Sequence, residues 1–186
     1  MSRSRPPVQK KNTLITGPPG IGKTTSLMKI ARMLREDVDG FYTDEIKEGG
    51  ERKGFRIVSL AGETGVLAHV DIKGVSKIGR YTVNIADLDE IGVVAIRRAM
   101  ETGKAIIVDE IGKMELFSAA FRSTVIEAID SPCPVIATIM EKEETFCDAI
   151  KARSDVQTVH VTKENRDAVP GEVVGLLRKY LYSDTQ

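Results

Sequence analysis

Cysteine, histidine and tryptophan are scarce or absent in this sequence of 186 residues. It contains two cysteines, two histidines and no tryptophan. Cys133 and Cys147 have neither CxxC nor zinc-ligand spacing, and His69 and His160 fall in apolar, strand-like runs rather than in a metal cluster. We therefore predict that all four side chains have structural roles.

An excess of one charge and a long apolar run are also missing. Lys plus Arg and Asp plus Glu both total 27, so the net charge gives no sign of a polyanionic partner such as a nucleic acid. No stretch approaches the roughly 20 apolar residues that span a bilayer, and the start MSRSRPPVQKK has no hydrophobic signal segment. These absences favour a cytoplasmic protein without a membrane or nucleic-acid partner, and we expect a monomer.

The length and composition fit one globular domain. Hydrophobic residues make up 41% of the chain, which suits one sizeable core but not two domains of usual size. We predict a flexible tail over residues 1–10 and a single domain over residues 11–182. A weak organelle-targeting signal is the alternative interpretation of the basic Ser/Arg/Pro start.

The first half of the chain changes its pattern twice. A β-branched run over residues 13–16 enters a Gly/Pro turn, and an amphipathic helix follows over residues 23–35. Residues 40–85, here called the β-rich insertion, contain short strand-like runs separated by glycine turns, which predicts a set of hairpins.

Strands and helices alternate in the second half. A helix begins near residue 86, and a uniformly apolar strand at residues 105–108 precedes further alternating helices and strands up to Tyr182. The pattern predicts an α/β fold with a mainly parallel sheet and helices on both faces. The apolar face predicted for the helix near residue 86 consists of Leu88, Ile91, Val94, Ala95 and Ala99.

Residues 17–25 satisfy GxxxxGK[ST], between an apolar strand and an amphipathic helix. Their glycines let backbone N–H groups turn inward around a β-phosphate. We expect Lys23 to bridge the β- and γ-phosphates, the Thr24 hydroxyl to ligate Mg²⁺ and Thr25 to reach the α-phosphate. A turn that only capped a helix would need neither the lysine nor the hydroxyl. The predicted nucleotide-binding residues are Gly17, Pro18, Pro19, Gly20, Ile21, Gly22, Lys23, Thr24 and Thr25.

An acidic pair follows the apolar strand at residues 105–108. The strand lifts Asp109 to the carboxyl end of the sheet, where open α/β sheets bind ligands, so Asp109 is predicted to hold Mg²⁺ through its water shell. Glu110 is then the predicted base, because a carboxylate beside the metal-binding one can orient and polarise an attacking water. The alternative is that Glu110 caps the next loop or pairs with a lysine.

Lys113 lies three residues beyond the predicted base, after the sharp turn that Gly112 permits. It is a candidate catalytic cation that neutralises charge on the γ-phosphate, although a lysine lacks the bidentate fork of an arginine. The alternative is a surface lysine in salt contact with Glu110 or Glu115.

Further basic and amide side chains have open roles. Arg153 ends a helix that we expect at the catalytic edge, where it either contacts a phosphate or balances the helix dipole. Arg52, Lys53 and Arg56 flank a turn of the β-rich insertion and either close over the site or form a solvated turn. Asn165 follows the last strand and either contacts the base or caps a helix.

With these residues together, the chain resembles the small nucleoside-triphosphatase family first described in thermophiles, whose animal members are called cancer-related nucleoside triphosphatases. The resemblance runs from about Lys11 to Arg178. The segment GPPGIGKTT is generic to P-loop proteins, whereas the others are specific in their order and spacing. These are GFRIVSLAGETGVLAH, GRYTVNI, IIVDEIGKMEL and IKARSDVQTVHVTKENRD.

The resemblance implies a RecA-like P-loop fold and Mg²⁺-dependent hydrolysis of ATP, GTP, CTP, TTP and UTP to diphosphate and phosphate, with little preference among bases. It assigns the phosphate loop, the metal-site acid and the base to the residues named above, and Lys113 to the lysine of the family's GKME segment. Relatives often carry a further basic or proline residue near the position of Lys142. Here a required basic side chain would come from Lys142 or Arg153.

The leading hypothesis is therefore a nucleoside-triphosphate phosphohydrolase. A small-molecule or nucleoside kinase is the first alternative, although the β-rich insertion stands where nucleotide kinases commonly insert a helical acceptor-binding piece. The second is a switch or motor ATPase that acts on nucleic acid or protein, and the missing basic excess argues against it.

Overall fold

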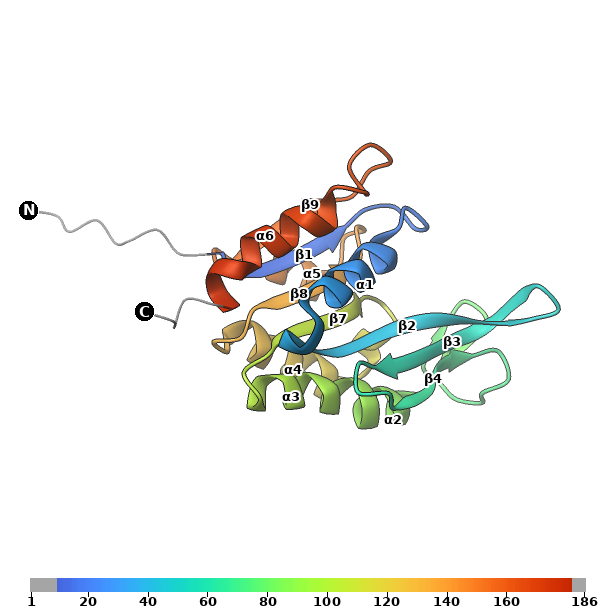
Figure 1. Ribbon diagram of the computed structural model, residues 1–186. Helices are drawn as coiled ribbons and strands as arrows, with labels where there is room; N and C mark the ends of the chain where they lie inside the picture. Colours follow the sequence, from blue (N-terminus) through green and yellow to red (C-terminus); the bar gives the residue numbers. More distant parts are fainter. Residues whose placement is uncertain (1–9, 182–186) are drawn as a thin grey trace, which may run out of the picture.

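The computed structural model describes residues 10–181 (Figure 1). Apart from Lys10, the predicted tail lies outside the described residues, as does the predicted domain end at Tyr182. Within the described part, nine strands form one sheet in the order β5-β6-β4-β3-β2-β7-β8-β1-β9. The strands are β1 (Asn12–Thr16), β2 (Val38–Glu48), β3 (Glu51–Ser59), β4 (Thr64–His69), β5 (Lys77–Ile78), β6 (Tyr81–Val83), β7 (Ala105–Ile111), β8 (Val135–Ile139) and β9 (Val156–His160).

Helices cover both faces of the sheet, with α1 and α6 on one face and α3 and α4 on the other (Figure 1). None of the helices in the described residues is long and apolar enough to cross a membrane. The helices are α1 (Lys23–Leu34), α2 (Ile85–Asp87), α3 (Val94–Glu101), α4 (Ala119–Asp130), α5 (Thr145–Lys151) and α6 (Val169–Leu181), with short turns η1 (Arg35–Asp37), η2 (Leu88–Val93) and η3 (Glu115–Phe117).

The parallel strands β1, β7 and β8 divide the core into two layers. Successive side chains of a strand point to opposite faces, so Leu14 packs in the layer of α3, α4 and α5, and Ile15 in the layer of α1 and α6. Ile106 and Ile107 of β7 alternate in the same way. Both faces of these strands are thus buried, which explains the apolar run over residues 105–108 of β7.

Strand β2 changes the sheet from parallel to antiparallel. It starts beside β7 in parallel pairing, with Val38 opposite Ala105, and pairs antiparallel with β3 over residues 41–48. The β-rich insertion forms the predicted hairpins, and its antiparallel strands continue the same sheet, which was not predicted. Four neighbouring strand pairs are parallel and four are antiparallel, so only the half with the phosphate loop is mainly parallel.

In the helix predicted near residue 86, the buried face differs from the predicted apolar face at Val94. Val94 is 48% exposed, whereas Ile96 is fully buried. The π-helical turn η2 precedes α3 and adds a residue to the helical repeat, which rotates the following residues around the axis. The regular period of 3.6 residues therefore gave a wrong prediction for Val94.

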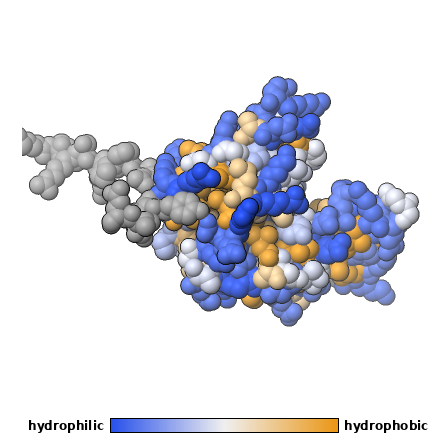
Figure 2. Space-filling model, viewed as in Figure 1, coloured by the Kyte–Doolittle hydropathy of each residue, from blue (hydrophilic) through white to orange (hydrophobic). Residues whose placement is uncertain are grey.

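Hydrophilic residues cover most of the molecular face in Figure 2, and hydrophobic ones show mainly toward its middle.

Candidate active site

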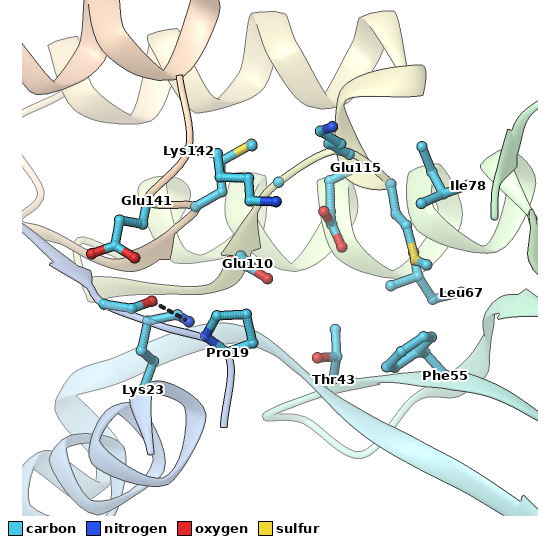
Figure 3. Close-up of a pocket in the computed structure, with 15 residues that line it drawn as sticks. Pro19, Lys23, Thr43, Phe55, Leu67, Ile78, Glu110, Glu115, Glu141 and Lys142 are labelled. Atoms are coloured by element: carbon cyan, nitrogen blue, oxygen red, sulfur yellow. Dashed lines mark hydrogen bonds between the residues drawn. The ribbon is translucent and has the colours of Figure 1, made fainter. Parts of the chain in front are cut away.

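The turn between β1 and α1 forms a glycine-rich loop. Gly17, Gly20 and Gly22 have φ angles of 146°, 76° and 113°, which glycine adopts without strain. A Cβ atom on Gly17 would also lie 2.8 Å from the carbonyl oxygen of Val161, so the segment after β9 packs directly against the loop. The Nζ atom of Lys23 donates to the carbonyl oxygen of Gly17 at 3.0 Å (Figure 3). The loop places a cation beside the N-terminus of α1, a combination that attracts a phosphate chain.

The carboxylate of Asp109 joins α1, β2, β7 and β8. Its Oδ1 atom accepts hydrogen bonds from the hydroxyls of Thr24 at 3.1 Å and Thr138 at 2.7 Å. Its Oδ2 atom accepts from the backbone amide and the hydroxyl of Thr43, both at 3.3 Å. Burial raises the pKa of Asp109 above its ordinary value, and these hydrogen bonds offset part of that effect. The structure thus brings together two residues predicted separately, Thr24 and Asp109.

Thr43 and Thr138 were missed by the sequence analysis. Thr138 lies at the end of the buried strand β8, next to β7, so a polar residue at the carboxyl end of a neighbouring apolar strand was a usable signal. Thr43 carried no such signal, because its position depends on the path of β2 beside β7.

The residues around Asp109 fit a magnesium ion. Thr24 and Asp109 supply hydroxyl and carboxylate oxygens, the hard ligands that Mg²⁺ prefers. No cationic side chain of residues 10–181 pairs with the buried Asp109, so a bound cation would compensate its charge. No group of three or more His, Cys, Asp and Glu in this part of the chain could hold a metal alone. Mg²⁺ would therefore depend on these two residues together with phosphate and water oxygens.

Glu110 points into the space in front of the phosphate loop (Figure 3). The peptide bond that joins it to Asp109 is cis. Burial raises the pKa of Glu110 above its ordinary value, the charge of Lys23 lowers it, and Asp109 raises it further. Among the described residues Glu110 neither caps a loop nor pairs with a lysine, which were the alternatives to a catalytic role. A half-buried, unbonded carboxylate with a raised pKa suits a base.

Glu115 is a second buried carboxyl group at the site, and its role was not predicted. It is 4% exposed and lies near Glu110, with Gly112 between them. Burial raises the pKa of Glu115 from its ordinary 4.5 to about 8, and the charges of Glu110 and Asp109 add to the effect, against backbone hydrogen bonds that lower it. The glutamate of the GKMEL segment is thus protonated at neutral pH, which its sequence context alone did not reveal.

Lys113, the predicted catalytic cation, and Lys142, a candidate for the further basic side chain, both line a cavity that also contains Lys23 and Glu110. Lys113 is exposed at its edge and makes no ion pair within the described residues, so the predicted alternative of a salt contact with Glu110 or Glu115 is not observed. Lys142 lines the same cavity, next to Glu141 (Figure 3). Either ammonium group is therefore placed to meet an anionic group in the cavity.

Arg153 lies away from the site, and its predicted position at the catalytic edge is wrong. It donates to Asp155 at 2.9 Å and to Asp130 at 2.6 Å. Asp155 precedes β9 and Asp130 ends α4, so this cluster belongs to the amino edge of the parallel strands. A helix that follows a parallel strand runs back across the sheet, and its last residues return to the edge where that strand began.

The other basic candidates are engaged in ion pairs of the β-rich insertion. Arg52 pairs with Glu45 at 2.7 Å, Lys53 with Glu51 at 2.8 Å, and the longest contact joins Arg56 to an aspartate at 3.7 Å. Arg52 and Arg56 are exposed and Lys53 is partly exposed, which agrees with a solvated turn rather than with closure over the site.

The Asn165 side chain stabilises the turn after β9. Its Oδ1 atom accepts from the amide of Thr162 and its Nδ2 atom donates to the carbonyl oxygen of His160, both at 2.8 Å. Helix α6 begins only at Val169, so Asn165 caps this turn rather than the helix. The turn therefore fixes the Asn165 side chain through one accepted and one donated hydrogen bond, and its contact with a base stays a prediction.

The two cysteines are structural, as predicted. Cys133 and Cys147 are both buried and unpaired. Burial raises the pKa of the Cys147 thiol to about 12, which keeps it protonated. The two histidines contact acidic neighbours. Nδ1 of His69 accepts from the backbone amide of Asp71 at 3.2 Å, and Nε2 of His160 lies 2.8 Å from Oε1 of Glu141.

Several cavities border the phosphate loop. One, of about 330 Å³, is lined by Thr24, Thr25 and Tyr42, and three others bear on the site. The phosphate cavity, of about 360 Å³, is lined by Lys23, Thr24 and Glu110. The apolar chamber, of about 380 Å³, shares Lys23 and Glu110 with it and extends toward the β-rich insertion. The outer cavity, of about 280 Å³, lies at Thr25 and is bordered by Arg166 and Asp167.

The phosphate loop, the acidic pair and the sheet between two helix layers define a P-loop NTPase. A protein-family model described as NTPase matches residues 12–174. Nucleoside-triphosphatase THEP1 of Thermotoga maritima is 46% identical over 165 residues, which cover 89% of this chain and 94% of that protein. The chain therefore belongs to the NTPase family. The expected enzyme class, a nucleoside-triphosphatase among the hydrolases acting on acid anhydrides, is confirmed with it.

Solved structures agree with this assignment. The crystal structure of THEP1 from the hyperthermophile Aquifex aeolicus superposes with a TM-score of 0.83 at 33% identity, over 89% of this chain and 98% of that one. The solution structure of a human cancer-related nucleoside triphosphatase gives a TM-score of 0.78 at 32% identity, over 94% and 99% of the two chains. Both neighbours support the predicted P-loop fold.

Proposed function

We propose that this protein is a Mg²⁺-dependent phosphohydrolase that cleaves the γ-phosphate of ATP, GTP, CTP, TTP and UTP with low base selectivity. The observation that carries the proposal is Glu110, a carboxylate without a protein partner in the described residues that faces the phosphate cavity beside Lys23. Hydrolysis needs a group that can accept a proton from water at this position.

The residues divide the work of the reaction. The loop of residues 17–25 binds the phosphate chain. The Lys23 ammonium group exchanges its hydrogen bond to the Gly17 carbonyl for one to the phosphates and neutralises charge on the terminal phosphate groups. Mg²⁺, when held with the nucleotide by Thr24 and Asp109, would neutralise charge on the phosphate oxygens. Glu110 orients the attacking water and takes its proton, and burial favours this by raising the pKa of the carboxylate.

Lys113 supplies a further positive charge in this proposal. Its loop borders the same cavity as Lys23 and Glu110, and its ammonium group has no acidic partner among residues 10–181. We expect Lys113→Met to lower kcat by about tenfold or more, because charge stabilisation at the γ-phosphate is lost, and Lys113→Arg to retain most of the activity. Equal rates for Lys113→Met and the wild type would rule this role out.

The outer cavity supports the proposed low base selectivity. The order of contacts along the phosphate loop puts the α-phosphate at Thr25, so the nucleoside lies beyond it, next to Arg166 and Asp167. Both side chains are exposed, and none of the residues lining this cavity is aromatic. Such a site offers neither stacking nor buried hydrogen bonds to distinguish bases. The cytoplasmic location, the monomeric state and the absence of a nucleic-acid partner stay predictions.

Steady-state phosphate release tests the proposal. With the five triphosphates and Mg²⁺, we expect kcat/KM values within about tenfold of one another, since base contacts in an exposed site contribute little. Glu110→Gln should lower kcat for ATP by about 100-fold or more while nucleotide binding persists, because the base is lost and the phosphate loop is intact. Glu143→Gln, an exposed glutamate near the site, is the matched control. Unchanged phosphate release by Glu110→Gln would show that Glu110 is not the base.

A further inference from the structure

The apolar chamber begins where the γ-phosphate would end. Lys23 and Pro19 form one end, Glu110 stands in the middle, and Leu67 and Ile78 form the far end (Figure 3). Phe55, Met114 and Met140 complete the apolar wall. Apart from Leu67, these apolar side chains are only partly buried, so molecules from solvent can reach them.

Hydrolysis alone does not account for this chamber. A water molecule occupies about 30 Å³ in the liquid, whereas the chamber measures about 380 Å³ and continues well past Glu110. The chamber also has polar lining residues, among them Lys113, Glu115 and Lys142. Its apolar part offers an attacking water no hydrogen bonds and so does not help to hold it. This part does stabilise an apolar molecule, by about 25 cal/mol for each Å² of its surface that leaves water.

The nucleoside of the triphosphate is not the occupant. Lys23 marks the γ end of the phosphate loop and Thr25 its α end. The chamber adjoins Lys23, whereas Thr25 faces the outer cavity. A nucleotide bound with its γ-phosphate at Lys23 therefore extends away from the chamber and leaves it open.

We propose that the apolar chamber binds a second substrate, a small molecule with an apolar body and a hydroxyl group, which accepts the γ-phosphoryl group in place of water. The apolar body would lie against Leu67 and Ile78, with the hydroxyl toward Glu110. The hydroxyl oxygen forms a bond to the γ-phosphorus, the bond from that phosphorus to the bridging oxygen breaks, and the hydroxyl proton passes to Glu110. The products are a phosphate monoester and the nucleoside diphosphate.

This inference rests on the proposed function for the position of the γ-phosphate and for the role of Glu110. It goes beyond it because the same site then transfers phosphate to a carbon-bound hydroxyl. An apolar occupant also excludes water from the γ-phosphate, so hydrolysis becomes the reaction of the empty chamber.

The test uses the full-length protein with MgATP and one of two alcohols at equal concentration. 1-Hexanol has the apolar body, and ethanol has the same hydroxyl without it. ³¹P NMR measures the ratio of alkyl phosphate to inorganic phosphate. We expect the ratio to be at least about tenfold higher with 1-hexanol, because each additional buried methylene strengthens binding several-fold.

Two variants locate the effect in the chamber. Ile78→Gln places an amide in the apolar wall and should lower the ratio of hexyl phosphate to inorganic phosphate several-fold. Val75→Gln is the matched control, because Val75 belongs to the same insertion, is 98% exposed and does not line the chamber. It should leave both products unchanged.

The outcomes separate this inference from the proposed function. Normal phosphate release with no excess of hexyl phosphate over ethyl phosphate would overturn the second-substrate site alone. Inhibition of phosphate release by 1-hexanol without hexyl phosphate would overturn the transfer step. A protein that releases no phosphate from MgATP in the absence of alcohol would instead contradict the proposed function.

Discussion

The hydroxyl of Thr24 lies 3.1 Å from Oδ1 of Asp109, although 85 positions separate the two residues in the sequence. Strand β8, which lies between β1 and β7, contributes Thr138 to the same carboxylate oxygen at 2.7 Å. The first turn of α1 and the carboxyl ends of the parallel strands β7 and β8 therefore meet at one buried acid. The magnesium ion of the proposed function would be held at this point, beside the phosphate loop.

Replacing Thr24 by valine removes one oxygen ligand and keeps the shape of the side chain. We expect the Mg²⁺-dependent rate of phosphate release to fall by about 100-fold, because Mg²⁺ loses the hydroxyl ligand that would hold it beside the phosphates. The Mg²⁺ concentration that gives half of the maximal rate should also rise. Both quantities come from phosphate release measured across a magnesium titration.

Thr158→Val is the control for this substitution, because Thr158 is an exposed threonine on the edge strand β9. It should leave the magnesium titration unchanged. The stability of Thr24→Val should fall by only about 1 kcal/mol, since Asp109 keeps its other hydrogen bonds. A wild-type magnesium dependence in Thr24→Val would refute the proposed metal ligand.

The parts of the candidate site that depend on a local motif or on strand order could be predicted from the sequence. The GxxxxGK[ST] spacing defines residues 17–25 locally, and an acid after an apolar parallel strand must lie at the carboxyl edge of the sheet. The same reasoning gave a wrong position for Arg153. The helix that follows β8 runs back across the sheet, so Arg153 at its end lies at the amino edge and not at the carboxyl edge.

The features that were missed depend on contacts between distant segments. The apolar chamber exists because the β-rich insertion continues the sheet and brings Leu67 and Ile78 opposite the phosphate loop, which no local pattern predicts. The π-helical turn before α3 places Val94 outside the core, and no local sequence pattern predicts this turn either. In both cases tertiary packing outweighed the local period.

The buried carboxyl group of Glu115 makes stability depend on pH. Its pKa rises from its ordinary 4.5 in the unfolded chain to about 8 in the folded protein, so the folded state holds this proton more tightly. Its stabilising effect is complete below pH 4.5 and is lost as the pH rises toward 8. Over that window the group lowers the free energy of unfolding by about 1.4 kcal/mol per pH unit.

Glu115→Gln should remove this dependence, because the amide does not titrate. Urea unfolding of the metal-free protein at several pH values between these limits should give a flatter profile for the variant, and its stability relative to the wild type should increase with pH. Glu127→Gln, an exposed glutamate on α4, should follow the wild-type profile. If Glu115→Gln and the wild type lose stability in parallel, Glu115 is ionised in the folded protein.

Gly40 illustrates a constraint that the sequence did not show. Its φ angle is 134°, and a Cβ atom placed on it would lie 2.0 Å from the carbonyl oxygen of Ile107 in the neighbouring strand β7. Any side chain there must push β2 away from β7, the strand that contains Asp109. We expect Gly40→Ala to lower the free energy of unfolding by about 3 kcal/mol or more, through backbone strain and lost strand pairing.

Gly175→Ala is the opposite case in the same chain. Gly175 lies within α6, and a Cβ atom there would have no neighbour within 4 Å. Alanine should therefore stabilise the protein by about 0.5 to 1 kcal/mol, through higher helix propensity and a less flexible unfolded chain. Urea unfolding of both variants measures the contrast. Equal stability of Gly40→Ala and Gly175→Ala would mean that β2 does not press against β7 at this point, and the position of Thr43 beside Asp109 would then need another cause.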